Sequence, residues 1–203
     1  MPGRDKYYPI NIREYLNLGN DDEAGEPALV ELLSGFSSPK NPDVEHFLKH
    51  NAIEFTKKNQ SVTYVVLSVK DIKLMGYFTL ALKPLTINGS TVSKTARKKL
   101  ARISELDEKS DTYNMSAYLI AQLAKNYSED EGKRITGNEL LDLAMDKIKE
   151  IQHLIGGVVT FLEAEGEEKL MFFYRNNQFR EFDVRHSKTD KNHRELFQLL
   201  RLL

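Results

Sequence analysis

The segment from Met115 to Ile151 constrains the fold more than any other part of the chain, because it joins strand-like and helical patterns through one short loop. Met115–Ala124 reads MSAYLIAQLA, an almost continuous apolar run about as long as a buried central strand. Glu131–Ile151 reads EGKRITGNELLDLAMDKIKEI and ends as an amphipathic helix. A buried strand, a glycine-bearing loop and a helix predict a fold that mixes α and β structure.

The start of this helix supports two interpretations. Thr136 and Glu139 have the spacing of a capping box, in which each side chain bonds a backbone N–H of the first turn. The apolar stripe behind the cap comprises Leu140, Ala144, Ile148 and Ile151. A cap does not require the remaining glycines and cations of the loop, Gly132, Lys133, Arg134 and Gly137. Free N–H groups at a helix start attract anions, so a phosphate site is the alternative, although the loop matches neither GxGxxG nor GxxxxGK[ST].

The remaining sequence alternates between the two periods. Residues 43–55 place apolar side chains at helical spacing, namely Val44, Phe47, Leu48, Ile53 and Phe55. The runs 62–67 and 73–82, separated by a Lys70-Asp71 turn, are rich in β-branched and aromatic residues and predict a β-hairpin. Residues 1–27 are polar and turn-rich, so we expect a loosely organised segment with at most one short strand or helix.

The C-terminal part shows the same alternation. A helix followed by a flexible surface loop is expected within 91–109, and Gly156-Gly157 is expected to end the long helix. The later expected elements are a buried strand at 158–162, a helix at 167–176, a strand at 179–184 and a helix or strand at 195–200. The pattern contains no internal repeat.

Length and composition exclude several classes of protein. A chain of 203 residues is long enough to bury a core without metals or disulfides, and we expect one domain, 1–203. The absence of cysteine excludes a disulfide framework and a thiolate metal site. A net charge of −1 gives no general attraction to nucleic acid or membranes. With no apolar leader and no run long enough to span a bilayer, the sequence favours a cytoplasmic protein.

Three stretches together resemble the GNAT superfamily of N-acetyltransferases. Residues 120–144 are similar to the acetyl-CoA-binding segment of that superfamily, in which a strand, a loop of the type Q/R-x-x-G-x-G/A and a helix continuing Leu-Leu-x-x-Ala follow one another. Residues 172–179 resemble the Phe-Tyr-x-x-x-Gly-Phe helix end of the family. Residues 36–55 are more distantly similar to the helical entry of toxin-like members. The resemblance implies a mixed, mostly antiparallel central sheet flanked by helices, an α/β (α+β) fold.

The resemblance also implies a cofactor site for acetyl-CoA and no metal. Backbone N–H groups at the end of the strand, around Leu123, Ala124 and Lys125, would face the pantetheine and the thioester. The pyrophosphate would lie on the N–H groups of the loop and helix start. This second set comprises Gly132, Lys133, Arg134, Ile135, Thr136, Gly137 and Asn138.

Direct attack of an amine on the thioester is the chemistry that the resemblance implies. Tyr174 is the expected donor of a proton to the departing CoA thiolate, because a phenol is still protonated at neutral pH. Glu163 is the candidate general base, with proton relay by water as the alternative and simple solvation at a strand end as the plain interpretation. The implied activity is an acyltransferase acting on an unknown amine acceptor, and a homodimer is compatible with the family.

The sequence departs from the family pattern in the loop and after the last helix. If Gly137 is the last family glycine, Ile135 stands where the first glycine belongs; if Arg134 takes the Gln/Arg position, Glu139 takes the Gly/Ala position. Gln178 replaces the usual glycine before the phenylalanine. These departures support a second hypothesis, a GNAT-fold interaction protein with weak or lost catalysis.

Two further patterns bear on ligands. The cations between Lys94 and Arg102 are interpreted first as a solvated helix face, and contact with tRNA or another phosphate-rich acceptor is the less favoured alternative. The latter would fit a toxin-type acetyltransferase acting on aminoacyl-tRNA. His46 and His50 share a helix face, but no third ligand accompanies them, so we expect a surface pair and no metal site.

Overall fold

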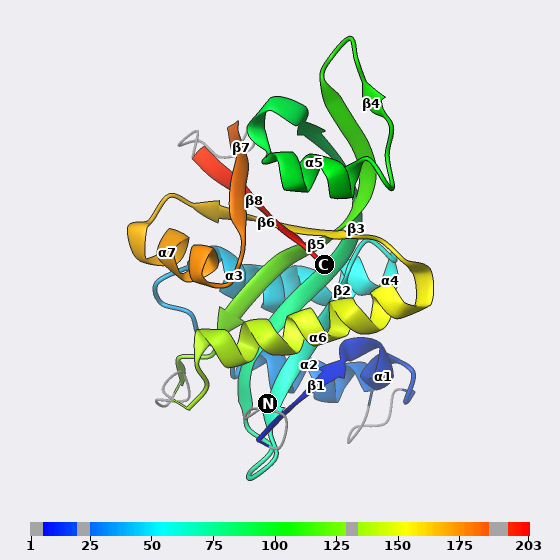
Figure 1. Ribbon diagram of the computed structural model, residues 1–203. Coiled ribbons are helices and arrows are strands. Elements are labelled where there is room, and N and C mark those ends of the chain that lie inside the picture. The colour runs from blue at the N-terminus through cyan, green and yellow to red at the C-terminus, as the bar shows by residue number, and fades with distance from the viewer. Residues whose placement is uncertain (1–5, 20–24, 129–133, 187–194) are drawn as a thin grey trace. The chain divides into compact units, whose positions relative to one another are not determined.

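The computed structural model describes residues 6–19, 25–128, 134–186 and 195–203 (Figure 1). The chain forms two compact units, of which the first contains residues 1–81 and 120–147 and the second residues 82–119 and 148–203. Three long elements contribute residues to both units, the strands β3 (Leu74–Asn88) and β5 (Thr112–Lys125) and the helix α6 (Gly137–Ile155). The single domain expected from the chain length stays a prediction.

The strands form an eight-stranded sheet in the order β1-β2-β3-β5-β6-β8-β7, with β4 paired to β5. The strands besides β3 and β5 are β1 (Tyr7–Asn11), β2 (Val62–Ser68), β4 (Leu106–Asp107), β6 (Val159–Glu165), β7 (Arg180–His186) and β8 (Glu195–Leu202). The registers given by the described residues are antiparallel except that between β5 and β6, which is parallel. The prediction of a mixed, mostly antiparallel sheet flanked by helices is confirmed.

The helices other than α6 are short. They are α1 (Ile12–Leu16), α2 (Gly25–Ser34), α3 (Pro42–His46), the π-helical η1 (Phe47–Asn51), α4 (Ala52–Lys57), the 3-10 helical η2 (Gly89–Thr91), α5 (Lys94–Leu100) and α7 (Glu168–Asn176). Polar side chains cap four of them, because Asn11, Asn41, Asn88 and Ser93 each accept a hydrogen bond from a backbone N–H of the first turn. Local sequence therefore fixes where these helices begin.

Each unit has its own apolar core. In the first unit, the core joins residues of the N-terminal helices to β2 and the start of β3; fully buried members include Leu29, Leu48, Val65 and Tyr77. In the second unit, it joins the later part of β3 to α5, β5, β6, β7 and β8; fully buried members include Ile87 and Leu100. The helical stripe of α6 is confirmed at Leu140, Ala144 and Ile148, which are buried, whereas its last member, Ile151, is half-buried.

The expectation of a loosely organised segment over residues 1–27 is wrong for its described part. Residues 7–16 form both β1 and α1, and β1 pairs with β2 from Tyr7 to Asn11. Tyr7 and Ile12 are buried, so the core of the first unit includes this segment. The polar composition of this segment did not indicate its two buried apolar residues, Tyr7 at the start of the strand and Ile12 at the start of the capped helix. Residues 20–24 of the segment lie outside the described residues.

Two smaller expectations need correction, and one open alternative is decided. Apolar residues at helical spacing in 43–55 are expected to face the core, yet Phe55 is 39% exposed. The π-helical turn of η1 inserts an extra residue per turn and so rotates the residues that follow. The loop expected after α5 contains β4, which pairs with β5. The ambiguous stretch at 195–200 is strand, because β8 pairs with β6 on one edge and β7 on the other.

Candidate functional site

The end of β5 and the start of α6, which carry the predicted cofactor residues, are joined within the first unit. The Lys125 ammonium at the end of β5 donates a hydrogen bond of 3.1 Å to the carbonyl oxygen of Ile135, just before α6. Burial lowers the pKa of Lys125. Ala124 and Ile135 are both buried, whereas Leu123 is half-buried. Gly132 and Lys133 lie outside the described residues.

Parallel pairing between β5 and β6 is short. It covers Tyr118 and Leu119 on β5 and Thr160 and Phe161 on β6. The Thr160 hydroxyl adds a buried hydrogen bond of 3.0 Å to the Tyr118 carbonyl at this point. The register with β6 does not extend into residues 120–125 of β5, which are the residues predicted to face the cofactor.

The predicted capping box is present at the start of α6. The Thr136 N–H donates to the Glu139 carboxylate at 2.8 Å, and the Glu139 N–H donates to the Thr136 hydroxyl at 3.1 Å. The backbone N–H groups of Gly137 and Asn138 belong to the first turn of the helix, at the positive end of the α6 dipole.

Replacement of Thr136 by alanine tests the energy of this cap. The variant loses the hydroxyl that accepts from the Glu139 N–H, so we expect the free energy of unfolding to fall by about 1 kcal/mol. Urea titration followed by circular dichroism measures the change. The control is Thr95→Ala at an exposed position inside α5, which should leave stability within about 0.5 kcal/mol of the parent chain. Equal stability of Thr136→Ala and the parent would contradict the cap.

Arg134 is held by the hairpin of β2 and β3. Its guanidinium donates two parallel bonds to the Asp71 carboxylate, at 2.9 and 3.0 Å, and a third of 2.9 Å to the Ser68 hydroxyl. The Arg134 carbonyl accepts a hydrogen bond from the Tyr7 hydroxyl of β1. The charge that was predicted to act on a pyrophosphate is therefore already paired with a carboxylate.

Two residues that sequence reasoning missed shape the same site. A Cβ at Gly76 of β3 would lie 2.7 Å from the Ala124 carbonyl oxygen and 3.2 Å from the Cα of Lys125, so only glycine allows β5 to approach this closely. The isolated glycine within an apolar strand was the available signal.

Asn126, the other missed residue, directly follows β5 and is only 2% exposed. Its amide donates to the Leu74 carbonyl at 2.9 Å and its oxygen accepts from the Ser37 N–H at 2.9 Å. Its own N–H bonds the Met75 carbonyl at 2.8 Å. The exit of the chain from β5 is thus fixed on both sides, although nothing in the sequence around Asn126 indicated burial.

The two predicted catalytic residues belong to the second unit. Tyr174 of α7 is only 7% exposed, and burial raises its pKa to about 12. In the part of the chain that the structure describes, its hydroxyl has no hydrogen-bond partner. Phe179 packs edge-on against its ring, with centroids 5.8 Å apart. The tyrosine is thus a protonated phenol held by aromatic packing.

Glu163 of β6 has partners on the neighbouring strands. Its carboxylate accepts a hydrogen bond of 2.7 Å from the Gln198 amide and lies 3.3 Å from the Arg185 guanidinium. Gln198 is its direct cross-strand neighbour on β8. Before Glu163 can accept a proton from an amine, it must share or release these contacts.

The residue that replaces the family glycine adopts the conformation that favours glycine. Gln178, between α7 and β7, has a φ of +68°. Its N–H bonds the Arg175 carbonyl and the next N–H, that of Phe179, bonds the Tyr174 carbonyl, so the turn closes the helix tightly. A glycine, as in the family pattern, would adopt this conformation without strain, whereas Gln178 adopts it at a cost in strain.

Replacement of Gln178 by glycine is expected to stabilise the protein. Relief of the left-handed strain outweighs the extra entropy of glycine in the unfolded chain, for a net gain of about 0.5–1 kcal/mol. Thermal unfolding measures the gain. Glycine at Asn177, where φ is −91°, is the matched control and should destabilise instead. A loss of stability in Gln178→Gly would contradict the assignment of strain.

Comparisons with known proteins agree on the fold. No protein-family model matches the sequence, and no curated protein matches it. The structure is similar to AtaT in complex with acetyl-methionyl-tRNAfMet, at 18% identity and a TM-score of 0.58 over 81% of this chain and 85% of that chain. It is similar to a tyrosine-to-phenylalanine mutant of KacT, at 22% identity and a TM-score of 0.57 over 82% of this chain and 86% of that chain. It is also similar to AtaTR bound with AcCoA, at 16% identity and a TM-score of 0.53 over 95% of this chain and 92% of that chain.

Similarity of this kind establishes the architecture. The chain has the GNAT fold, as its strand order and the three sequence stretches indicated. Within the described residues, no helix is long and apolar enough to cross a membrane. The described residues also contain no group of three or more His, Asp or Glu side chains placed to hold a metal ion.

Proposed function

We propose that this protein is an N-acetyltransferase that transfers the acetyl group of acetyl-CoA to an amine. The observation that carries the proposal is the junction of β5 and α6, where a buried strand end is bonded to a capped helix start. A helix start of this kind presents the positive end of its dipole to an anion such as a pyrophosphate. The occurrence of AcCoA in the AtaTR structure supports the choice of cosubstrate.

The proposed cofactor site follows the chain through this junction. Backbone groups at Leu123, Ala124 and Lys125 take the pantetheine and thioester. The pyrophosphate lies on the loop and helix start, which comprise Gly132, Lys133, Arg134, Ile135, Thr136, Gly137 and Asn138. Of these groups, the N–H of Gly137 is best suited to bind the pyrophosphate, because it lies at the positive end of the α6 dipole and glycine has no side chain.

In the proposed reaction, the acceptor nitrogen attacks the thioester carbonyl carbon and a C–N bond forms as the C–S bond breaks. The departing thiolate takes the proton of the Tyr174 hydroxyl. The proton lost by the amine passes to Glu163, or to water, and finally restores the phenol. Because the pKa of Tyr174 is raised to about 12, the residue enters each turnover protonated at any physiological pH.

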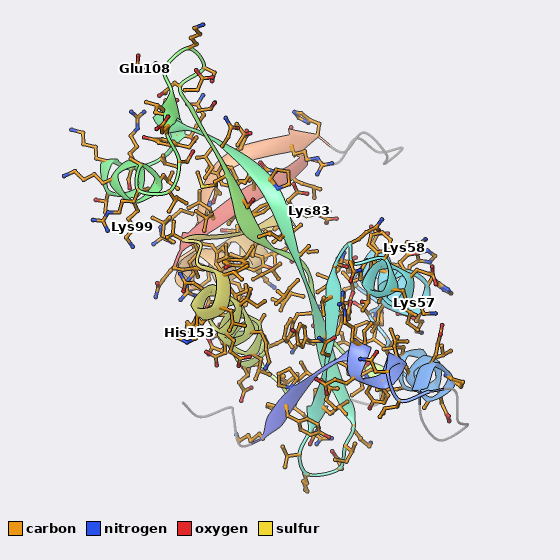
Figure 2. All side chains as sticks on the ribbon, turned by 90° about the vertical axis from the view of Figure 1, so that its right-hand side faces the viewer. Lys57, Lys58, Lys83, Lys99, Glu108 and His153 are labelled. Carbon is orange, nitrogen blue, oxygen red and sulfur yellow. The ribbon has the colours of Figure 1, made fainter. Side chains whose placement is uncertain are left out.

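A second candidate, an aminoacyl-tRNA as the amine acceptor, is favoured by two observations. One is the AtaT structure with acetyl-methionyl-tRNAfMet. The other is α5, whose cations Lys94, Arg97, Lys98 and Lys99 surround the buried Ala96 and Leu100; Lys99 is labelled on this helix in Figure 2. The expectation that tRNA is the less favoured partner weakens accordingly. A toxin-type enzyme would arrest growth when expressed, whereas normal growth after induction would remove this candidate.

The non-catalytic alternative and the cellular setting belong to the same proposal. A GNAT-fold interaction protein remains the competing hypothesis, because the loop around Ile135 lacks the regular glycines of the family. We place the protein in the cytoplasm, where acetyl-CoA and amine acceptors are present together. A homodimer is the assembly proposed for it, and its mass in solution can be measured by light scattering.

Ligand-induced stabilisation tests the function. Acetyl-CoA at millimolar concentration should raise the melting temperature, because a ligand that binds the folded state stabilises it by mass action. Release of free CoA thiol in the presence of an amine panel then separates the enzyme from the interaction protein. Absence of any thermal shift rejects the acetyltransferase, while a shift without thiol release for any amine, including aminoacyl-tRNA, favours the interaction protein.

A further inference from the structure

We propose that Arg134 is a positioning residue, which the hairpin of β2 and β3 holds so that the backbone before α6 turns its N–H groups toward the cofactor. The inference rests on the proposed function and extends it, because it assigns Asp71, Ser68 and Tyr7 to the cofactor site although none of them belongs to the loop. All of these residues lie in the first unit.

The side chain of Arg134 is fixed by a planar, two-point contact. The parallel bonds of 2.9 and 3.0 Å to the Asp71 carboxylate match the fork of a guanidinium, which lysine cannot reproduce. The third bond reaches Ser68, which is 2% exposed. The Arg134 guanidinium holds the pKa of Asp71 at about 2, so the pair stays charged throughout the physiological range.

The backbone of the same segment is also fixed, in part by Tyr7, the cross-strand partner of Ser68. The carbonyls of Arg134 and Ile135 accept from the Tyr7 hydroxyl and the Lys125 ammonium, respectively. In a trans peptide the carbonyl and the following N–H point in opposite directions, so the N–H of Ile135 points away from Tyr7. The Ile135 side chain is fully buried and prevents rotation of the segment.

The tip of the hairpin is itself rigid enough to serve as an anchor. The Ile72 N–H bonds the Ser68 carbonyl at 2.9 Å and the Ser68 N–H bonds the Lys73 carbonyl at 3.0 Å. Ile72 has a φ of +59°, a conformation that a β-branched residue adopts only where the surroundings impose it. The tip therefore presents the Asp71 carboxylate in one orientation.

Replacement of Asp71 by asparagine separates positioning from direct charge contact, because the two roles predict opposite signs. If Arg134 bound phosphate directly, removal of the neighbouring anion would free the cation and leave CoA binding equal or tighter. If Arg134 is a positioning residue, Asp71→Asn weakens CoA binding by about five- to tenfold in calorimetry, the range of a contact coupling energy. Arg134→Lys, which keeps the charge but loses the fork, should weaken it similarly.

Pantetheine supplies a readout that general destabilisation would not change. The KM for acetyl-CoA should rise in Asp71→Asn while the KM for acetyl-pantetheine, which lacks the pyrophosphate, stays the same. The matched control is Glu26→Gln, which breaks an ion pair of 2.7 Å between α2 and Lys57 of α4 without touching the loop. Unchanged or tighter CoA binding in Asp71→Asn would overturn the inference.

A measurement without ligand distinguishes failure of this inference from failure of the proposed function. Hydrogen exchange of the peptide 134–140 should be about tenfold faster in Asp71→Asn than in the parent chain, and unchanged exchange overturns the inference. If exchange is faster in Asp71→Asn but the parent chain does not bind CoA, the proposed function is overturned while the anchoring of Arg134 by Asp71 is retained. If Asp71→Asn does not fold, Ser68→Ala removes one of the three bonds and should shift exchange in the same direction by less.

Discussion

Replacement of Tyr174 by phenylalanine is expected to lower kcat by about 10²- to 10⁴-fold with little change in the KM for acetyl-CoA. The phenol donates its proton only as the C–S bond breaks, so its loss affects the transition state and leaves binding of the cosubstrate intact. Stopped-flow detection of the CoA thiol measures this effect. Loss of the hydroxyl should not destabilise the fold, because among the described residues it bonds no other group.

A buried tyrosine elsewhere in the second unit provides the control for Tyr174. Tyr113 of β5 is 4% exposed and lies in the apolar core, so Tyr113→Phe should retain turnover. The pH profile adds a separate test, because burial raises the pKa of Tyr174 from 10 to about 12. The neutral phenol is the active form, so ionisation of Tyr174 should lower the activity only as the pH rises toward about 12. A loss of turnover no larger in Tyr174→Phe than in Tyr113→Phe would contradict the role.

Replacement of Gly76 by alanine is expected to abolish cofactor binding and to destabilise the first unit by about 1–3 kcal/mol. The new Cβ would lie 2.7 Å from the Ala124 carbonyl oxygen, inside van der Waals contact with backbone that cannot rotate away. It would also lie 3.4 Å from the Leu140 side chain of α6. Relief of the overlap must move the end of β5, which is the strand proposed to hold the thioester.

The matched glycine is Gly35, where an added Cβ meets its nearest atom, the Leu32 carbonyl oxygen, at 3.6 Å. Gly35→Ala should therefore be tolerated, with stability within about 0.5 kcal/mol of the parent chain. Urea unfolding and CoA calorimetry on both variants separate the two effects. Retained CoA affinity in Gly76→Ala would show that the close approach of β3 and β5 does not matter for the cofactor.

Features with a local signal could be predicted from the sequence. The capping box of Thr136 and Glu139 and the stripe behind it depend on spacings of three and four residues, and the structure confirms both. The glycine position at Gln178 was visible as a departure from the family pattern, and its φ of +68° supplies the reason. Signals of this kind arise from neighbouring residues, so one sequence is enough to show them.

Features that depend on distant residues could not be predicted in the same way. Asp71 and Arg134 are separated by 63 positions, and neither has a local pattern that indicates a partner. The hydrogen-bond partners of Asn126 come from two distant segments, one at Ser37 and one at Leu74 and Met75, and its burial follows from their packing. The last strand looked equally helical, because its conformation is decided by pairing with β6 and β7.

A structure determined with CoA tests the central claim most directly. Continuous electron density should run along residues 123–125 of β5 and end with the pyrophosphate on the N–H groups at the start of α6. Arg134 should still bond Asp71 in that structure, as it does without ligand. Density for CoA elsewhere on the chain, or none at saturating CoA, would contradict the account.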